Sequence, residues 1–518
     1  MVTYDVLYPN ILTQRQIEYA REKLGIKVLS AVKVDDAGLL PVSNHLPYFY
    51  FFVAVRRGNT SRYALEVART LTLLADKAGS VVDVIDVSEQ FDYVYWYDGK
   101  RWRKFKAHVF KIMCRAPYDV PRIKYRMEAI LLRFRDDLRR LVQVLAEGTS
   151  ECEDIASRES CVLLGAVRWL ALASRIDLKY FGGLFGFSGF NIKYTIRVSW
   201  DYNIRFFNAK PIYYGTIDIG KALDVRLKVL DIETIGEKAA FEACMEKLRG
   251  ERCKERLEKI KLFVGLMEHW LGEEPKEDNA YYYLLPEEMD EFLKDIRRTR
   301  ILLGHNIIGY DIPRIAYVLG KVLAETENEY LGRQREATET VKRVLLQRLV
   351  LDNARILEAH SSSFQIGAVR SLEDVAKLLS REAGIPRDRL KLKVKVGGRV
   401  GRLPLGELKK YNFNDLWLTA AVGNVFVPFI LVVSALFQIP PSIVQSSFAG
   451  VLGESYMFRL FELNGILLGY ARAERVIEAP KVFIEPMLSE KAVREIAEIV
   501  RRYNLDFDKL EKVVRGVA

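Results

Sequence analysis

The sequence is poor in histidine and cysteine, the two residues from which most zinc sites are built. It has five of each in 518 residues, and no two cysteines form a C-x-x-C pair. A structural zinc site is therefore not expected, because such sites need closely spaced thiolate or imidazole ligands. We favour five buried thiols at Cys114, Cys152, Cys161, Cys244 and Cys253. The alternative is two local disulfides, Cys152–Cys161 and Cys244–Cys253, which inside a cell are typical of hyperthermophiles.

Several short motifs are also absent. The first residues lack the basic and apolar regions of a signal peptide, so we expect a cytoplasmic, nucleoid-associated protein and no secretion. We find no P-loop, no dinucleotide-binding glycine pattern and no nucleophile elbow. The common phosphate-binding loops and the serine-hydrolase motif are thereby excluded.

Charge is missing from one long run, Leu416–Gly453, and Ala420–Phe437 within it is nearly all apolar. That length is sufficient to cross a bilayer. However, Asn424 and Pro428 interrupt the run, and no basic anchors lie close to both of its ends. We therefore expect a buried core helix and no membrane partner.

The remaining composition is that of a globular protein of two to four domains. Half of the residues are hydrophobic and 28% are charged. The net charge of +11 permits nucleic acid or an acidic partner without selecting either. Few histidines with abundant Lys, Arg and Glu are compatible with a heat-adapted protein.

Periodicity predicts an α/β chain in three parts: 1–215, 216–430 and 431–518. The first part alternates strands and helices, with helices at Thr13–Leu24 and Ser61–Ala78 and another ending near Ala146. Phe91–Arg103 predicts a β-hairpin that turns at Asp98–Gly99, and its returning strand is expected to continue through Cys114. In 216–430, strands alternate with helices, which favours an α/β layer.

Residues 101–140 combine arginine and lysine with aromatic side chains. Such a mixture suits single-stranded nucleic acid, through phosphate contacts and base stacking. The candidate DNA contacts are Arg101, Arg103, Lys104 and Lys106. A solvated basic surface beside a half-buried hairpin is the alternative, and the residues alone do not separate the two.

Carboxylates recur at element boundaries in 216–430. Asp231 and Glu233 alternate along the strand Leu227–Thr234 and so point to the same side, which is costly unless a cation lies between them. Asp311 follows a strand ending at Gly304 and starts a helix, where a helix cap is the alternative role. Tyr411 and Asp415 are one helical turn apart on a shared face.

Taken together, these stretches resemble the proofreading half of a family B DNA polymerase. Asp231–Ile–Glu233–Thr resembles the first motif of the RNase H-like DEDD exonucleases, and Gly304–Pro313 resembles the second. Tyr411-x-x-x-Asp415 resembles the third motif in its tyrosine form. Flanking segments resemble the family's N-terminal domain (Tyr93–Arg122) and its connector to the palm (Phe448–Leu467 and Ala479–Pro486).

The resemblance implies an RNase H-like 3′–5′ exonuclease domain in 216–430, followed by a helical connector and palm remnant. By this resemblance Asp231, Glu233, Asp311 and Asp415 hold two Mg²⁺ or Mn²⁺ ions, and Tyr411 orients a water molecule with the help of Glu233. Asn306 would hold the DNA strand or the geometry of the second motif. His305 is not expected to act as a base, since Tyr411 fills the position at which the histidine subtype places its base.

The family's polymerase motifs, D-x-x-S-L-Y-P, K-x-x-x-N-S-x-Y-G and Y-x-D-T-D, are absent from this sequence. We therefore expect 3′–5′ exonuclease activity on single-stranded 3′ ends of DNA without polymerisation. The protein partner implied is a chain carrying a polymerase palm, or another replisome subunit, in a split replicative or repair polymerase. A non-catalytic DNA-binding or replisome scaffold is the main alternative, and an unrelated RNA nuclease is the weakest.

Overall fold

The structure, a computed structural model, describes most of the chain. The described residues are 31–33, 39–41, 45–55, 60–97, 102–147, 152–154, 156–178, 181, 184–201, 203, 205–235, 260–326, 334–346, 348–364, 371–392, 400 and 403–470. Predicted features that lie outside them are the helix 13–24 and the turn at 98–99.

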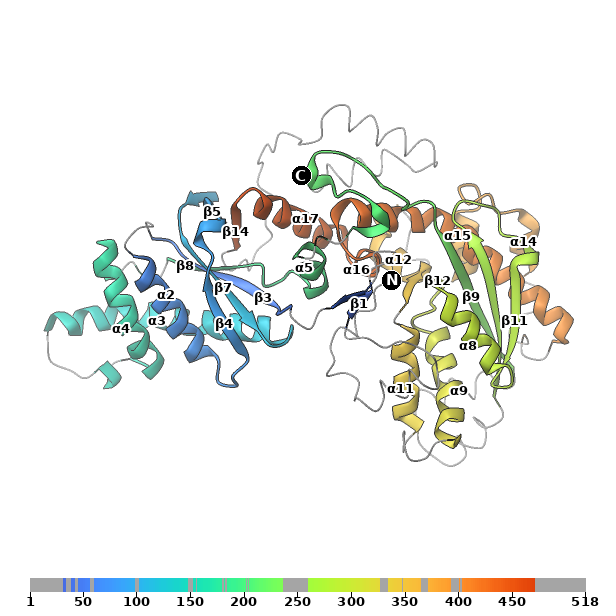
Figure 1. Ribbon diagram of the computed structural model, residues 1–518, viewed down its shortest axis with the longest axis horizontal. Coiled ribbons are helices and arrows are strands. Elements are labelled where there is room, and N and C mark those ends of the chain that lie inside the picture. The colour runs from blue at the N-terminus through green and yellow to red at the C-terminus, as the bar shows by residue number, and fades with distance from the viewer. Residues whose placement is uncertain are drawn as a thin grey trace. The chain divides into compact units, whose positions relative to one another are not determined.

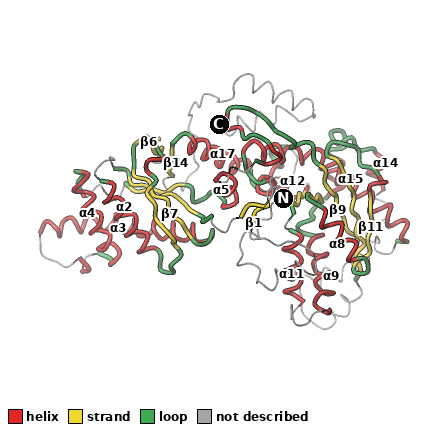
Figure 2. The backbone as a smooth tube through the Cα atoms, viewed as in Figure 1, coloured by secondary structure: helices red, strands yellow, loops and turns green. Residues whose placement is uncertain are grey.

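The chain divides into two compact units. The first comprises Met1–Ser43, Asp201–Leu452 and Ile484–Val517, and the second comprises Asn44–Trp200, Gly453–Phe483 and Ala518. Helices and strands alternate in both (Figures 1 and 2), so the predicted α/β class is confirmed. The three-part division expected from the sequence stays a prediction.

A five-stranded mixed sheet forms the centre of the first unit. Its strand order is β11–β10–β9–β12–β13. The antiparallel strands are β9 (Arg226–Ile235), β10 (Lys261–Trp270) and β11 (Ala280–Leu285), and β12 (Ile301–Gly304) and β13 (Leu349–Asp352) continue parallel to β9. The central position of β9 explains its mostly apolar sequence, because both of its edges are paired and both faces are covered. A separate pair, β1 (Ala31–Lys33) and β2 (Leu39–Pro41), is antiparallel.

Helices cover both faces of this sheet. One face packs against α8 (Met289–Arg298), α9 (Asp311–Thr326) and α11 (Gln334–Leu345), whose buried residues share one apolar core with Leu230, Ile232 and Val264. The opposite face packs against α15 (Leu405–Phe437). Figure 1 shows α9 and α11 side by side and α15 beside the strands. The smaller helices of this unit are α12 (Asn353–His360), α13 (Leu372–Leu378), α14 (Arg387–Leu392) and α16 (Pro441–Ser446).

The long apolar run lies in α15. Among the described residues, this is the one helix whose length and composition would allow it to cross a membrane, and 83% of its most apolar window is buried inside the protein. Asn424 is bonded within the protein: its side chain donates to the carbonyl of Glu273 and accepts from the backbone N–H of Gly272. The run is thus a core helix, as expected.

The second unit is built on a seven-stranded sheet in the order β4–β7–β3–β8–β14–β5–β6. Its strands are β3 (Tyr48–Val53), β4 (Val81–Asp86), β5 (Tyr93–Tyr97), β6 (Trp102–Phe105), β7 (His108–Cys114), β8 (Phe185–Ser188) and β14 (Ile466–Tyr470). β5 and β6 pair antiparallel, so the predicted hairpin forms. The predicted continuation of its second strand through Cys114 is wrong. β7 is a separate central strand, because β3 and β4 occupy both of its edges.

Helices α2 (Ser61–Ala75), α3 (Asp119–Glu147) and α4 (Arg158–Ser174) pack together on one face of this sheet, against Phe49, Phe51 and Phe110. The remaining helices are α5 (Tyr194–Asp201) and α17 (Ala449–Leu463).

A buried ion pair links α5 to α17. A guanidinium nitrogen of Arg197 lies 2.9 Å from a carboxylate oxygen of Glu462, which also accepts a 2.8 Å hydrogen bond from the hydroxyl of Tyr50. The rings of Tyr48 and Phe458 lie 4.9 and 4.5 Å from the same guanidinium carbon. Aromatic faces and one carboxylate therefore compensate the burial of this arginine.

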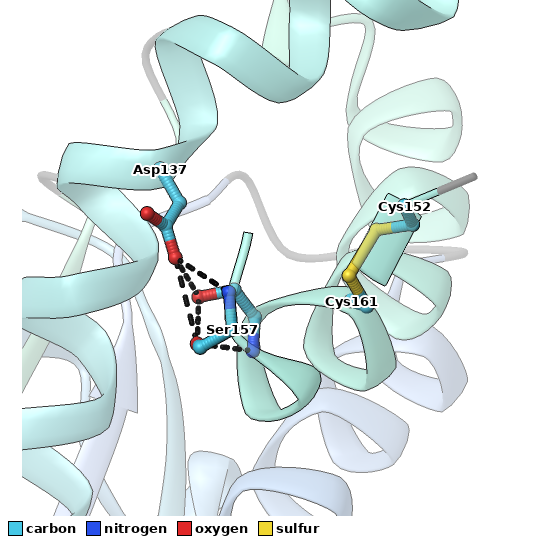
Figure 3. Close-up of a disulfide and its surroundings, with 5 residues drawn as sticks. Asp137, Cys152, Ser157 and Cys161 are labelled. Atoms are coloured by element: carbon cyan, nitrogen blue, oxygen red, sulfur yellow. Dashed lines mark hydrogen bonds between the residues drawn. A yellow bond between two sulfur atoms is a disulfide. The ribbon is translucent and has the colours of Figure 1, made fainter. Parts of the chain in front are cut away.

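A disulfide joins Cys152 to Cys161 at the start of α4, with a Cα–Cα distance of 5.8 Å (Figure 3). The preferred interpretation of five thiols is therefore wrong for this pair, because η4 (Cys152–Asp154) folds back on the first turn of α4. Cys114 is a buried thiol, and burial raises its pKa to about 12. Cys244 and Cys253 lie outside the described residues.

Asp137 of α3 supports the same helix start. Its carboxylate accepts hydrogen bonds from the hydroxyl of Ser160, at 2.6 Å, and from the backbone N–H of Ser157, at 3.3 Å (Figure 3). The Ser157 hydroxyl in turn accepts from the backbone N–H of Ser160 and caps α4. The beginning of α4 is thus linked to η4 by the disulfide and to α3 by the hydrogen bonds of Asp137.

Reduction of the Cys152–Cys161 bond is expected to lower the free energy of unfolding by about 2–3 kcal/mol, because a short closed loop restricts the unfolded chain. Thermal unfolding with and without a reducing agent measures this. Cys152→Ser should give the same lowered midpoint with or without reductant, and Cys114→Ser should remain sensitive to it. A Cys152→Ser midpoint equal to that of the oxidised wild type would contradict the prediction.

Candidate metal centre

Strand β9 supplies two carboxylates to one face of the five-stranded sheet. Leu230 and Ile232 are buried in the core beneath α8 and α9. The alternation of the strand places Asp231 and Glu233, both partly exposed, on the opposite face, where α15 packs. Successive residues of the strand therefore alternate between the apolar core and the face that carries the carboxylates.

Helix α15 supplies the third carboxylate. Asp415 is 4% exposed, and its carboxylate oxygen lies with one oxygen each of Asp231 and Glu233 in a group whose members are all within 4.8 Å of one another. These three residues form the carboxylate cluster. Among the residues that the structure describes, no other group of three or more acidic, histidine or cysteine side chains meets this spacing.

Tyr411 lies one turn before Asp415 on α15, and the charges of the cluster act on its phenol. Burial, followed by the negative charges of the three carboxylates, raises the pKa of Tyr411 above its ordinary value. The hydroxyl consequently stays protonated and can donate a hydrogen bond toward the carboxylates or toward a molecule held between them. The predicted residues Asp231, Glu233, Tyr411 and Asp415 are thus brought together.

Asn412 was not among the predicted site residues, although it directly follows Tyr411. Its side-chain N–H donates to a carboxylate oxygen of Asp231 at 2.8 Å, and the residue is fully buried. Gly265 on β10 pairs in register with Asp231, and a Cβ there would collide with the Asn412 amide oxygen. The glycine therefore makes room for the asparagine that orients Asp231.

Asp311 is predicted as a metal ligand but is not a member of the carboxylate cluster. It is 4% exposed and begins α9. Burial raises the pKa of Asp311 to about 7, and the charge of the neighbouring Asp352 adds to this rise. Three interactions lower the pKa in part: a hydrogen bond from the backbone N–H of Asp311 itself, the charge of Arg314, and a hydrogen bond from the backbone N–H of Ile232. The bond to Ile232, between Asp231 and Glu233 on β9, places Asp311 beside the strand that carries the site.

Asp352, at the end of β13, is a second buried carboxylate that the sequence reasoning missed. It is 1% exposed, and burial raises its pKa. Its oxygens accept from the backbone N–H of Asn306 at 2.7 Å and of Ile308 at 3.1 Å. Its position directly after a run of apolar residues, like that of Asp231, was the signal available in the sequence. Asp352 thus holds the loop that leads to Asp311.

Asn306 adopts a left-handed backbone conformation, with φ of 60°, and its side chain is exposed. Its carbonyl accepts from the N–H of Tyr310 at 2.8 Å. The residue therefore shapes the turn between β12 and α9. His305 lies close enough to Asp352 to lower the pKa of that carboxyl, which burial otherwise raises.

The basic residues predicted to contact DNA belong to the second unit. Arg103, Lys104 and Lys106 are exposed on and just after β6, and Arg101 lies outside the described residues. The ammonium of Lys104 is 3.8 Å from the ring centroid of Tyr93, and that of Lys106 is 6.0 Å from it. The hairpin therefore combines cations with aromatic faces, as the sequence indicated.

The donor set of the carboxylate cluster suits a hard divalent cation. All three donors are carboxylate oxygens, which Mg²⁺ and Mn²⁺ prefer over nitrogen or sulfur. Three negative charges within 4.8 Å repel one another, and a cation between them would relieve that repulsion. The hydrogen bond from Asn412 orients Asp231 in the way that outer partners orient metal ligands.

Comparisons with known proteins give a distant structural similarity. No protein-family model matches the chain, and no curated protein matches it. A solved structure that does match is the family B DNA polymerase from the hyperthermophilic archaeon Pyrobaculum calidifontis, with a TM-score of 0.42 and 14% sequence identity. The match covers 82% of this chain and 46% of the polymerase, so this chain spans about half of that protein's length. At this level the similarity is structural and partial, and no activity follows from it.

Asp311→Asn is expected to remove a pH-dependent cost of folding. Folding raises the pKa of this carboxyl from 3.8 to about 7, mainly because the group becomes buried. Between these values the unfolded chain releases a proton that the folded chain keeps, so this group lowers stability as the pH rises from about 4 to about 7. In metal-free buffer the variant should exceed wild type in free energy of unfolding at about pH 8 and match it near about pH 4.

Urea unfolding at the two pH values measures this difference. Asp388→Asn, at an exposed aspartate on α14, is the matched control and should follow wild type at both. If the free energy of unfolding of Asp311→Asn depended on pH in the same way as that of wild type, the raised pKa of Asp311 would be ruled out as the cause of that pH dependence.

Asn412→Ala is expected to weaken cation binding at the carboxylate cluster by about 10- to 100-fold, because Asp231 loses the donor that orients it. Asn414→Ala is the matched control. Asn414 is equally buried on α15, but it donates to the carbonyl of Arg389. Titration with Mn²⁺, followed by electron paramagnetic resonance, measures the affinity. Equal weakening by both variants would show that Asn412 acts through the general stability of α15.

Proposed function

We propose that this protein is a 3′–5′ DNA exonuclease that acts on single-stranded 3′ ends and requires Mg²⁺ or Mn²⁺. The observation that carries the proposal is the carboxylate cluster, three carboxylates within 4.8 Å of one another with the Tyr411 phenol beside them. The order of the motifs along the chain, from β9 through the start of α9 to α15, supports the same activity.

Bound divalent cations supply activated water and neutralise the charge that develops on a phosphodiester. The residues of this chain would hold the cations and orient the groups around them. Asp231, Glu233 and Asp415 provide the oxygen ligands, and Asn412 fixes the orientation of Asp231. Asp311, beside Ile232 on β9, is the fourth proposed ligand and would shed its proton when a cation binds, since a nearby positive charge lowers a carboxyl pKa.

Tyr411 would position the water or the phosphate. Because its hydroxyl stays protonated, it can donate a hydrogen bond to the attacking water or to the scissile phosphate and hold either in line for attack. Glu233 can accept a hydrogen bond from the same water. Asn306, exposed at the turn before α9, is a proposed contact to the DNA strand.

DNA is the proposed substrate because the second unit joins Lys104 and Lys106 to aromatic rings, a combination that suits phosphates and bases. The chain would act as the exonuclease subunit of a split replicative or repair polymerase, in the cytoplasm and near the nucleoid. A protein partner carrying a polymerase palm belongs to this proposal.

A non-catalytic DNA-binding scaffold is the second candidate, and one observation favours it. Burial raises the pKa of Asp311 to about 7, so this carboxyl is partly protonated near neutral pH when no metal is bound. A protein that never binds a cation would keep such a carboxyl neutral at little cost.

The test uses a 5′-labelled single strand, Mg²⁺ and the full chain. Wild type should shorten the strand from its 3′ end. Asp231→Ala should lose at least about 100-fold in rate, and Tyr411→Phe about 10- to 100-fold, because the water or phosphate is held less well. Product ladders on a denaturing gel give the rates.

Asp388→Ala, at an exposed carboxylate in the same unit but outside the cluster, should keep the wild-type rate. No shortening by wild type, with intact binding of the strand, would reject the nuclease and favour the scaffold. Shortening that persists in Asp231→Ala would assign the activity to another site.

A further inference from the structure

The outer face of α3 in the second unit carries a row of arginines. Arg122, Arg126, Arg133 and Arg140 follow one another at spacings of four, seven and seven residues, so they share one face of the helix. We call these four residues the arginine face. Arg126, Arg133 and Arg140 are exposed, and Arg122 is 37% exposed at its side chain. From Arg126 to Arg140 the face extends about 21 Å along the helix.

Two tyrosines lie near the beginning of α3, one in the turn before the helix and one on the helix, three residues after Arg122. Tyr118 is 69% exposed and Tyr125 is 58% exposed, which is unusual for aromatic side chains of this size. Tyr125 precedes Arg126, and Tyr118 lies one turn before Arg122. The buried ammonium of Lys124 is 4.5 Å from the ring centroid of Tyr125 and supports that ring from the protein side.

Acidic neighbours offset only part of this charge. Arg122 pairs with Asp119 at 2.6 Å, and Arg133 approaches Glu159 of α4 at 3.6 Å. Arg133 nevertheless keeps 57% of its side chain exposed. Asp136 and Asp137 also lie on this face. Asp136 pairs with Arg135, outside the face, and Asp137 accepts hydrogen bonds from Ser157 and Ser160 at the start of α4. Exposed pairs of this kind contribute little stability and exchange readily with another anion.

We infer that the arginine face, together with Tyr118 and Tyr125, is a binding site for single-stranded nucleic acid. Successive arginines suit a run of phosphates, since guanidinium groups bind phosphate oxygens in pairs. Exposed tyrosine rings suit unpaired bases, which stack on them regardless of sequence. A duplex would satisfy the arginines and leave the tyrosines without bases to stack on.

This site goes beyond the proposed nuclease, because it lies in the second unit and needs neither the carboxylate cluster nor a cation. It differs as well from the hairpin β5–β6, where Lys104 already lies over the ring of Tyr93. Figure 1 shows α3 with α2 and α4 beside the seven-stranded sheet. The helix is therefore held by its inner face, and its outer face is available to a ligand.

The test measures binding without cleavage. A fluorescein-labelled oligothymidylate is titrated with the full chain in EDTA, and fluorescence anisotropy gives the affinity at several salt concentrations. The variant Arg126→Gln/Arg133→Gln/Arg140→Gln should bind at least about tenfold more weakly and reduce the logarithmic salt slope by about 2, since each lost phosphate contact removes about 0.7 from it. Tyr118→Ala/Tyr125→Ala should weaken binding about 5- to 100-fold and leave the salt slope unchanged.

The matched control removes the same charge from other surfaces of the same unit. Arg62→Gln/Arg69→Gln/Arg168→Gln changes exposed arginines on α2 and α4 and should keep the wild-type affinity and slope. Equal weakening by the two triple variants would overturn the site, because general positive charge would then explain the binding. Equal affinity of wild type for a duplex of the same length would also overturn it.

Cleavage of a labelled trinucleotide by the arginine variant separates this inference from the nuclease. Such a substrate carries too few phosphates to follow the arginine face, so the variant should cleave it at the wild-type rate if the nuclease exists. Binding in EDTA is measured whether or not wild type cleaves DNA, so failure of the nuclease proposal leaves this result readable. Circular dichroism of each variant confirms that α3 is still folded.

Discussion

The hydrogen bond between Asn412 and Asp231 depends on a close approach of α15 to the sheet, and the candidate site depends on that approach. A side chain larger than hydrogen at Gly265 would collide with Asn412, and one at Gly423 would collide with Leu303 of β12. Both glycines bring the helix within reach of the strands. The same packing that buries the long apolar run thus delivers Asp415 and Tyr411 to the side of β9 that already carries Asp231 and Glu233.

Burial of charge recurs in both units, with different compensation in each. Arg197 is offset by Glu462 and by aromatic faces, so its charge is retained inside the protein. Burial raises the pKa of both Asp311 and Asp352, the charge of Asp352 adds to the rise at Asp311, and backbone N–H groups offset only a part of it. The arginine therefore keeps its charge, whereas a carboxyl whose pKa lies near neutrality changes its charge when a proton or a cation binds.

Much of the fold and part of the site could be predicted from local patterns. The alternation in β9 places Asp231 and Glu233 together, and the helical spacing does the same for Tyr411 and Asp415, because both depend only on neighbouring residues. The strand continuing to Cys114 was predicted wrongly, because the partners of β7 come from β3 and β4. The Cys152–Cys161 bond was not preferred, since spacing alone does not show that η4 folds back on α4.

The sequence by itself determined which side chains share a face: the two carboxylates of β9, the tyrosine and aspartate of α15, and the apolar periodicity that makes this helix a core element. These follow from the geometry of single strands and helices. Only the tertiary structure decided which faces meet. It brought Asp415 to Asp231, placed Asn412 against Gly265, coupled Asp311 to Asp352, and turned the arginine face of α3 outward, because packing joins residues whose separation along the chain carries no local signal.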